Sequence, residues 1–334
     1  MVASDGWFGR NMDNIEMPLS PEDVRNAWRI LTDEPVPEDG LLAQMCALPS
    51  LTDFRRIVMQ THAFQLQLPR AVAKVPLSAP PLYVEVATDP ATEAALLALV
   101  REKWLRMGKE RPHWSVTGRD EHLPDHLAMN VAGFEASGQE DLNMVLAMLA
   151  RNGLPADLFA HVCDFGCGVG RVSFPMARRF LRVTGCDVSE AHLRIAREEA
   201  ARLGTGHLDF VLVEPPLFGM TEPFDLWFSH LVLQHNPPPV MAAILRRMFG
   251  LLSPGGVALF QVPTYIRGYR SDSASYLRAP PADLMEVHVL PQQEILTLAR
   301  NARCEVLEIR EDCSVWPPSE AVSNMMLFRK RFIA

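Results

Sequence analysis

The sequence predicts an α/β fold with a parallel sheet, preceded by a small helical module. Two observations predict it: strand-like and helix-like segments alternate regularly after residue 137, and only helical patterns occur between residues 19 and 74. Strands and helices that alternate at this spacing form βαβ units, with helices on both faces of the sheet. The chain has 334 residues, of which 48% are hydrophobic and 22% charged, so it can bury the core that such a sheet needs.

The N-terminal part divides into three segments by composition. Residues 1–18 are polar and form a loose tail, residues 19–74 form the helical module, and residues 75–136 form a linker and a covering segment. Ser20 is a predicted N-cap, because Pro21 follows it at the first helical position. Further helices are predicted near Leu41–Ala47, Leu51–Gln67 and Ala91–Met107, whereas no periodicity is clear over Gly108–Phe134.

Residues 137–334 form the predicted α/β domain. Ser137 and Glu140 make a capping box, which predicts that a helix starts there and runs to about Asn152. The predicted strands that follow are His161–Phe165, Val183–Asp187, Asp209–Val213, Phe224–Ser229, Gly256–Pro263, Glu305–Arg310 and Asn324–Phe332. The predicted helices between them start near Ser173 or span Glu190–Leu203, Val240–Leu252 and Gln292–Ala302.

A glycine-rich turn, Gly166-Cys167-Gly168-Val169-Gly170, follows the first of these strands. Glycines let the backbone turn tightly and approach a ligand closely, with its amides free to donate. Arg171 stands where a dinucleotide motif has its third glycine, and no Gly-Lys-Ser/Thr phosphate loop follows. Asp164, two residues before the turn, suits the cationic amino-acid end of a ligand. A nicotinamide oxidoreductase therefore requires that Arg171 fit a place usually kept for glycine.

Two further acids end the next two strands. Asp187 follows Gly170 by 17 residues, near the distance at which a carboxylate accepts hydrogen bonds from ribose hydroxyls. Glu214 ends the third strand, where an acid faces the adenine side of such a site. Acids at the carboxyl ends of consecutive strands agree with the crevice where open α/β sheets bind ligands. Alternatively, Asp187 and Glu214 simply cap loops.

These motifs together resemble class I S-adenosylmethionine-dependent methyltransferases. Asp164 and the glycine turn match the glycine motif of that superfamily, Asp187 matches its ribose acid, and Phe224–Ser229 matches its fourth strand. Leu252–Gly256 matches the turn before its fifth strand, so the resemblance covers about residues 137–334. It implies a Rossmann-like seven-stranded methyltransferase sheet, mostly parallel, that ends in a C-terminal antiparallel hairpin.

The resemblance also implies the cofactor and its binding residues. The cofactor is S-adenosyl-L-methionine, the product is S-adenosyl-L-homocysteine, and no metal is expected. The expected binding residues are Asp164, Gly166, Cys167, Gly168, Gly170, Arg171, Asp187, Val188, Glu214, Pro215, Ser229 and His230.

Finer similarities point to an acceptor and a partner. Within the superfamily, Leu233–Pro238 and Phe260–Thr264 are similar to bacterial members found with surface-polysaccharide assembly. Residues 20–66 are similar to a helical module found ahead of bacterial glycosyltransferases and methyltransferases. A small-molecule or glycan acceptor and a glycosyltransferase partner are therefore expected. One alternative is a non-catalytic docking protein that binds the cofactor. N-methyltransfer is a second alternative, although methylation of DNA or glutamine is disfavoured, because Pro239 takes the aromatic place of an Asn-Pro-Pro motif.

Methyl transfer to a hydroxyl needs a general base, for which His235 is the first choice and His230 the second. Both histidines follow the fourth predicted strand and therefore lie near the expected methyl position. Alternatively, either histidine packs against the following helix. The candidate acceptor-binding residues, which could instead pack on the core or lie in a solvated loop, are Trp104, His113, Trp114, Tyr269 and Arg270.

Charge and composition exclude other classes of function. The formal net charge of −8 disfavours nucleic acid as the main partner, and no 18-residue apolar run predicts membrane insertion. The six scattered cysteines are typical of core residues in a reducing cytoplasm, where we expect the protein to act. His122 and His126 could bind a metal, but Pro124 interrupts the helix that would align them.

Overall fold

The computed structural model of the chain consists of two compact units, Met1–Ala71 and Val72–Ala334, which we describe separately. The structure describes residues 20–32, 39–48, 53–54, 57–58, 79–213, 220–280, 285–312, 314–315 and 320–332. Among the helices of these ranges, none combines the length and the apolar character needed to cross a membrane.

The described residues of the first unit include helices α1 (Pro21–Thr32) and α2 (Asp39–Cys46). The Ser20 hydroxyl accepts the backbone N–H of Asp23 at 3.1 Å, and this bond confirms the predicted N-cap. A small apolar core joins the described parts of this unit: Val24, Trp28, Leu42, Met45, Phe54 and Val58. Most of the predicted helix Leu51–Gln67 lies outside the described residues.

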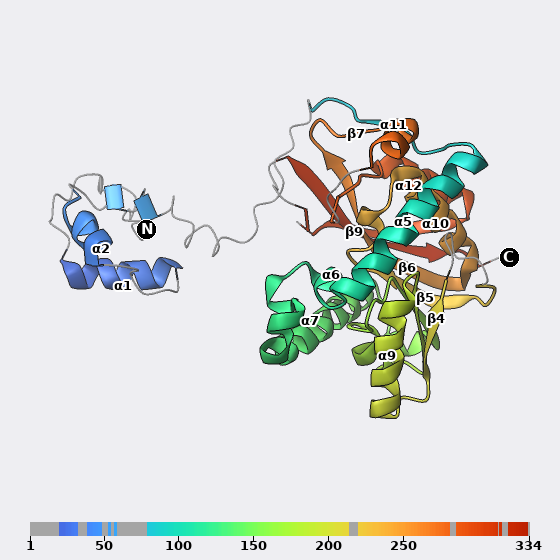
Figure 1. Ribbon diagram of the computed structural model, residues 1–334, viewed down its shortest axis with the longest axis horizontal. Helices are drawn as coiled ribbons and strands as arrows, with labels where there is room; N and C mark the ends of the chain where they lie inside the picture. Colours follow the sequence, from blue (N-terminus) through green and yellow to red (C-terminus); the bar gives the residue numbers. More distant parts are fainter. Residues whose placement is uncertain are drawn as a thin grey trace, which may run out of the picture. The chain divides into compact units, whose positions relative to one another are not determined.

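The second unit is built on a seven-stranded sheet of order β4-β3-β2-β5-β6-β9-β8 (Figure 1). Its strands are β2 (His161–Phe165), β3 (Arg182–Asp187), β4 (Leu208–Leu212), β5 (Phe224–Ser229), β6 (Leu252–Ile266), β8 (Cys304–Glu311) and β9 (Ala321–Lys330). All neighbours pair in parallel except β6 with β9 and β8 with β9. The mostly parallel sheet with a C-terminal antiparallel hairpin is therefore confirmed. A separate two-stranded sheet pairs β1 (Tyr83–Val84) with β7 (Arg270–Ser271).

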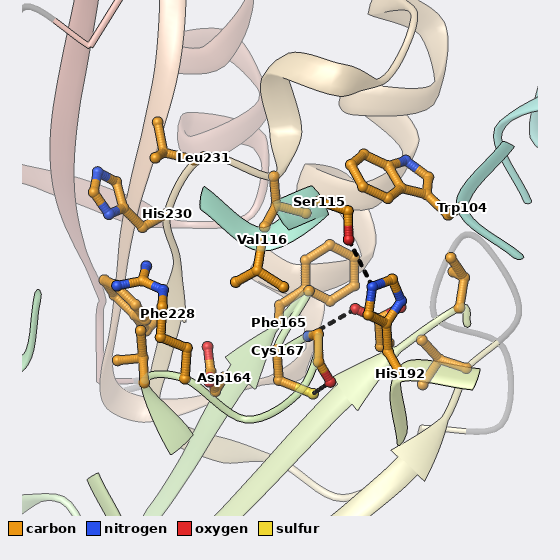
Figure 2. A pocket seen from close by; sticks show the side chains of 18 of the residues that line it. Trp104, Ser115, Val116, Asp164, Phe165, Cys167, His192, Phe228, His230 and Leu231 are labelled. Carbon is orange, nitrogen blue, oxygen red and sulfur yellow. Dashed lines mark hydrogen bonds between the residues drawn. The ribbon is translucent and has the colours of Figure 1, made fainter. Parts of the chain in front are cut away.

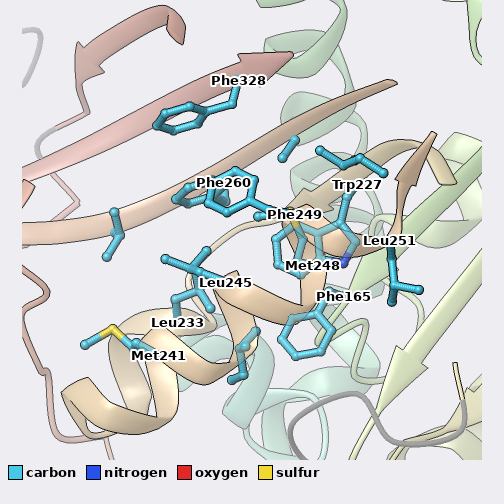
Figure 3. Close-up of a cluster of buried hydrophobic side chains, with 14 of the residues drawn as sticks. Phe165, Trp227, Leu233, Met241, Leu245, Met248, Phe249, Leu251, Phe260 and Phe328 are labelled. Atoms are coloured by element: carbon cyan, nitrogen blue, oxygen red, sulfur yellow. The ribbon is translucent and has the colours of Figure 1, made fainter. Parts of the chain in front are cut away.

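Helices cover both faces of the seven-stranded sheet. On one face lie α7 (Pro124–Arg151), α8 (Ser173–Ala177) and α9 (Glu190–Leu203), and on the other lie α10 (Pro238–Leu251) and α12 (Gln292–Asn301). Successive side chains of a strand point to opposite faces, so Leu226 and Phe228 join the first core and Trp227 joins the second. Figure 3 shows the second core, in which the rings of Phe260 and Phe328 stack with centroids 5.7 Å apart.

The remaining helices precede or flank the sheet. They are α5 (Pro90–Glu110), α6 (Trp114–Thr117) and α11 (Ser273–Arg278), with short 3₁₀ turns η1 (Asp120–His122), η2 (Ala156–Leu158) and η3 (Leu233–His235). Asp89 caps α5, because its carboxylate accepts the backbone N–H groups of Ala91 and Thr92 at 3.0 Å each. The covering segment is thus mostly helical, and the expectation that Gly108–Phe134 is irregular is wrong.

The predicted helix start at Ser137 is also wrong. Helix α7 begins at Pro124, where a proline in the first turn loses no hydrogen bond, and it continues without a break through Ser137. The Ser137 hydroxyl donates to the Phe134 carbonyl at 2.7 Å instead of capping the helix. Gly138 has a packing role, because a Cβ there would collide with the carbonyl of Arg171 beside the glycine turn.

Candidate functional site

A pocket opens at the carboxyl ends of β2, β3 and β5 (Figure 2). The glycine turn lines it together with the residues that follow β3 and β5. Helices α5 and α6 contribute residues from the covering segment. The pocket therefore lies in the crevice where an open α/β sheet binds its ligand, as the three acidic strand ends predict.

The glycine turn adopts a conformation that favours glycine. Gly166, Gly168 and Gly170 have φ values of +73°, +55° and +87°, in the left-handed region. A Cβ on Gly166 would collide with Val232, and one on Gly168 would collide with Val116. These two valines thus lie directly over the backbone that a ligand would approach.

The cavity itself is small. Its volume is about 90 Å³, below the roughly 300–1,000 Å³ that is usual for ligand pockets. Val232 follows Leu231, a non-glycine residue with a φ of +58°. Backbone strain of this kind is concentrated at functional sites. Val116 and Val232 both line this cavity beside the glycine turn.

Asp187 is held by two backbone amides. Its carboxylate accepts the N–H of Gly168 at 2.9 Å and the N–H of Ser189 at 2.8 Å. The acid is thereby oriented between the glycine turn and the start of α9, and it lines the pocket.

Asp164 is a buried carboxyl on the pocket wall. Burial raises its pKa to about 6, although the Ser173 hydroxyl, which donates to it at 2.6 Å, opposes this shift. An ammonium group nearby would favour the ionised form of this carboxyl. Its environment therefore fits the cationic amino-acid end expected from the sequence.

Arg171, Asp141 and His230 form a connected group beside the pocket. The Arg171 guanidinium donates to the Asp141 carboxylate at 2.5 Å, and His230 Nδ1 lies 3.1 Å from the same oxygen. Burial pushes the pKa of Asp141 upwards, but the bond from His230 and the charge of Arg171 bring it below its usual value. A carboxylate only accepts, so His230 carries a hydrogen on Nδ1, and in the neutral ring the lone pair is on Nε2. Asp141 is not among the predicted site residues, because nothing in its neighbouring sequence indicates that it bonds Arg171 and His230.

His235, the first-choice base, lies outside the pocket lining. It is buried, and its Nδ1 atom donates to the Glu286 carbonyl at 2.8 Å, so Nε2 faces the side-chain amide of Gln234 at 3.3 Å. Burial lowers the pKa of His235 to about 4. Both ring nitrogens are engaged within the protein, whereas His230 lines the pocket, so His230 is the candidate base considered below.

The structure separates the other predicted residues. Asp164, Gly166, Cys167, Gly168, Arg171, Asp187, Val188 and His230 line the pocket. Gly170 and Ser229 do not line the pocket. A Cβ on Gly170 would collide with the ring of Phe174, and the buried Ser229 hydroxyl donates to the Phe165 carbonyl at 3.2 Å. Glu214 and Pro215 lie outside the described residues.

Of the five acceptor candidates, only Trp104 lines the pocket. His113 packs edge-on against Phe134 at 5.2 Å, and the Trp114 indole donates to Asp120 at 3.1 Å. Tyr269 bonds His288 at 2.8 Å, and Arg270 lies over the ring of Tyr83 at 5.3 Å. In the described part of the chain, no three His, Cys, Asp or Glu side chains converge as a metal site would require.

Comparison with known proteins identifies the domain. A family model described as a methyltransferase domain matches residues 162–256, the stretch that carries β2, the glycine turn, Asp187 and β5. The chain contains a class I S-adenosylmethionine-dependent methyltransferase domain. This domain supplies most of the pocket, whereas α5 and α6 precede it.

Curated relatives match parts of the chain. A trans-aconitate 2-methyltransferase of Methylobacterium radiotolerans is 38% identical over 35% of this chain and 42% of its own length. A ubiquinone biosynthesis O-methyltransferase of Paracidovorax citrulli is 28% identical over 45% of this chain and 65% of its own length. The chain thus spans less than two thirds of the curated relatives it matches.

A solved structure shares the fold of the methyltransferase domain. The magnesium protoporphyrin IX methyltransferase of Synechocystis, crystallised with S-adenosylhomocysteine, covers 70% of this chain and 99% of its own. Its TM-score is 0.51 at 18% sequence identity, a likeness that concerns the fold alone.

Proposed function

We propose that this protein transfers a methyl group from S-adenosylmethionine to an oxygen atom of a small acceptor. The observation that carries the proposal is His230, which lines the pocket with its Nδ1 atom bound to Asp141 and its Nε2 atom free to accept a proton. A positioned acid or base of this kind is what transfer to a hydroxyl requires.

The residues of the pocket fit the cofactor. Asp164 and Arg171 offer charged groups to the amino-acid end, and the fixed carboxylate of Asp187 offers acceptors to the ribose hydroxyls. Gly166 and Gly168 form a cradle without Cβ atoms, against which a ligand can lie. When bound, S-adenosylmethionine supplies an electrophilic methyl group on its sulfonium.

In this proposal His230 acts as the general base. Its Nε2 atom takes the proton of the acceptor hydroxyl, and the Asp141 carboxylate holds the ring in the required tautomer and stabilises the imidazolium that forms. Arg171 connects this pair to the glycine turn, because it directly follows Gly170 and donates to Asp141. One continuous set of contacts therefore links the proposed base to the glycine turn.

Transfer to oxygen agrees with the name of one curated relative, a ubiquinone biosynthesis O-methyltransferase. A carbohydrate acceptor, a cytoplasmic location and docking of the N-terminal helices on a glycosyltransferase stay predictions from sequence resemblance. N-methylation and a non-catalytic docking role are outcomes that the following experiment distinguishes.

The test is methyl transfer from labelled S-adenosylmethionine to four acceptor pools: carboxylic acids, phenols, carbohydrates and amines. We expect a labelled ether from the phenols or the carbohydrates, with turnover about 10²- to 10⁴-fold lower for His230→Ala. A labelled ester from the carboxylic acids alone would contradict the general base, because a carboxylate has no proton to give up. Affinity for S-adenosylhomocysteine should be nearly unchanged. His126→Ala is the matched control, because His126 is exposed and does not line the pocket. Label on nitrogen, no product from any pool, or full turnover by His230→Ala would overturn the proposal.

A further inference from the structure

The pocket lining combines polar and apolar side chains. Asp164, Arg171 and His230 are among the polar ones. The apolar ones include Val100, Trp104, Val188, Val213 and Ile244. In Figure 2, His230 and Trp104 lie on opposite sides of the pocket, with Trp104 on the side of His192.

Contacts between helices place Trp104 near the start of α9. Gly108 stands one helical turn after Trp104 on α5, and a Cβ there would collide with Ser189 and His192. Ser189 is the residue whose amide binds Asp187. This half of α5 therefore packs beside the acid proposed to bind ribose, away from the amino-acid end.

Trp104 packs against the buried side chain of His235. Its ring meets the ring of His235 edge-on at 5.5 Å, and the His235 Nδ1–H is fixed on the Glu286 carbonyl. The neighbouring Lys103 pairs with the Glu286 carboxylate at 2.8 Å, and Tyr276 donates to the same oxygen at 2.6 Å. These contacts tie α5 to the segment beside η3 and so define where the indole stands.

We propose that Trp104 is the wall against which the adenine of the cofactor binds. The inference rests on the proposed use of S-adenosylmethionine. With the amino-acid end at Asp164 and the ribose at Asp187, the flat base is left with the side of the pocket on which Trp104 lies. An aromatic side chain suits a purine, because stacking buries the apolar face of the base and leaves its edges free to form hydrogen bonds. Helix α5, which lies outside the matched domain, would then complete the cofactor site.

The test compares two ligands by calorimetric titration of the full chain. S-adenosylhomocysteine has both ends of the cofactor, whereas 5′-methylthioadenosine retains the adenosine and lacks the amino acid. We expect Trp104→Ala to weaken both ligands by a similar factor, about 5- to 150-fold, the worth of one base stacked on an aromatic side chain. Trp104→Phe should retain most of the affinity for both ligands.

Leu105→Ala is the matched control. Leu105 is the next residue on α5 and borders a separate surface groove with Arg101 and Lys109, so its loss should leave both affinities unchanged. Unchanged binding by Trp104→Ala, or a loss confined to S-adenosylhomocysteine, would overturn the assignment. If the wild type binds neither ligand, the proposed function fails as well, which separates the two failures.

Fluorescence gives a second measurement that does not depend on the alanine variant folding. Methylthioadenosine should quench the tryptophan emission of the wild type, and most of this change should be absent from Trp104→Phe. Equal quenching in the two proteins would place the adenine elsewhere and overturn the proposal.

Discussion

One hydrogen bond joins His230 and Asp141 across 89 residues of sequence, with Nδ1 and the carboxylate oxygen 3.1 Å apart. His230 follows β5 at the pocket, and Asp141 stands on α7. The bond determines which nitrogen of His230 has a free lone pair. The relationship therefore connects the covering helix to the chemistry proposed for the pocket.

We expect Asp141→Asn to lower turnover by about 10²- to 10⁴-fold, the usual worth of a general base. The amide can donate to Nδ1 and favours the tautomer in which Nε2 carries the hydrogen, as occurs when the acid of a catalytic triad is replaced by its amide. The substitution keeps the size of the side chain, so affinity for S-adenosylhomocysteine should be largely retained. Turnover and calorimetric affinity are the measurements.

The neighbouring exposed carboxylate provides the control for this substitution. Glu140→Gln makes the same chemical change one residue earlier on α7 and should leave turnover unchanged. Wild-type turnover by Asp141→Asn would show that the bond to His230 has no part in catalysis.

We expect Asp187→Ala to weaken binding of S-adenosylhomocysteine by about 10- to 100-fold, because hydrogen bonds to a charged acceptor are lost. The structure adds a second consequence. Asp187 also accepts the amides of Gly168 and Ser189, so the variant should melt at a lower temperature even without ligand. Asp209→Ala, an exposed acid on the neighbouring strand β4, should change neither quantity. Native affinity in Asp187→Ala would mean that the ribose binds elsewhere.

We expect Leu231→Gly to be more stable than Leu231→Ala, by about 1 kcal/mol in the free energy of unfolding. Leu231 has a φ of +58°, where alanine is strained and glycine is not. At Leu212, in strand β4, the order of the two variants should be reversed, because glycine weakens a strand. Chemical denaturation of the four proteins measures the differences. If alanine is the better residue at both positions, Leu231 carries no strain.

The buried carboxyl of Asp164 gives a pH dependence with a defined sign. Burial raises its pKa from 3.8 to about 6 in the folded chain, so the folded state binds the proton more tightly between these values. Its contribution to stability is therefore present below about pH 4 and is lost as the pH rises through 6.

We accordingly expect Asp164→Asn to stabilise the ligand-free chain at pH 8 by about 3 kcal/mol, with the advantage vanishing near pH 4. The same variant should bind S-adenosylhomocysteine more weakly, since it lacks the charge proposed to meet the ammonium group. Asp209→Asn, which changes an exposed acid, is the control. A difference in stability that does not vary with pH would contradict the assignment.

Local sequence determined the elements that carry the glycine turn. Strands β2 and β5 and helix α9 begin and end at the predicted residues, because each is an apolar or amphipathic run bounded by turn residues. The glycines, Asp164 and Asp187 could also be predicted from local sequence, since their spacing follows from one strand–turn–helix–strand unit. These features depend on residues close together in the chain.

The start of α7 depended on more than its local sequence. Ser137 and Glu140 satisfy a capping motif, yet α7 runs through them because the helix already begins at Pro124. Gly138 in the middle of that helix allows close contact with the backbone of Arg171. A capping motif states only that a helix can start, and packing against the glycine turn decides whether it does.

Only the tertiary structure distinguishes the surroundings of the two histidines. His230 and His235 lie five residues apart with similar neighbours, and the sequence ranked His235 first. Asp141 orients the first towards the pocket, whereas the Glu286 carbonyl and Trp104 engage the second inside the protein. A histidine's role depends on which partners its two nitrogens meet, and those partners come from α5, α7 and the segment before α12. Only folding brings them together.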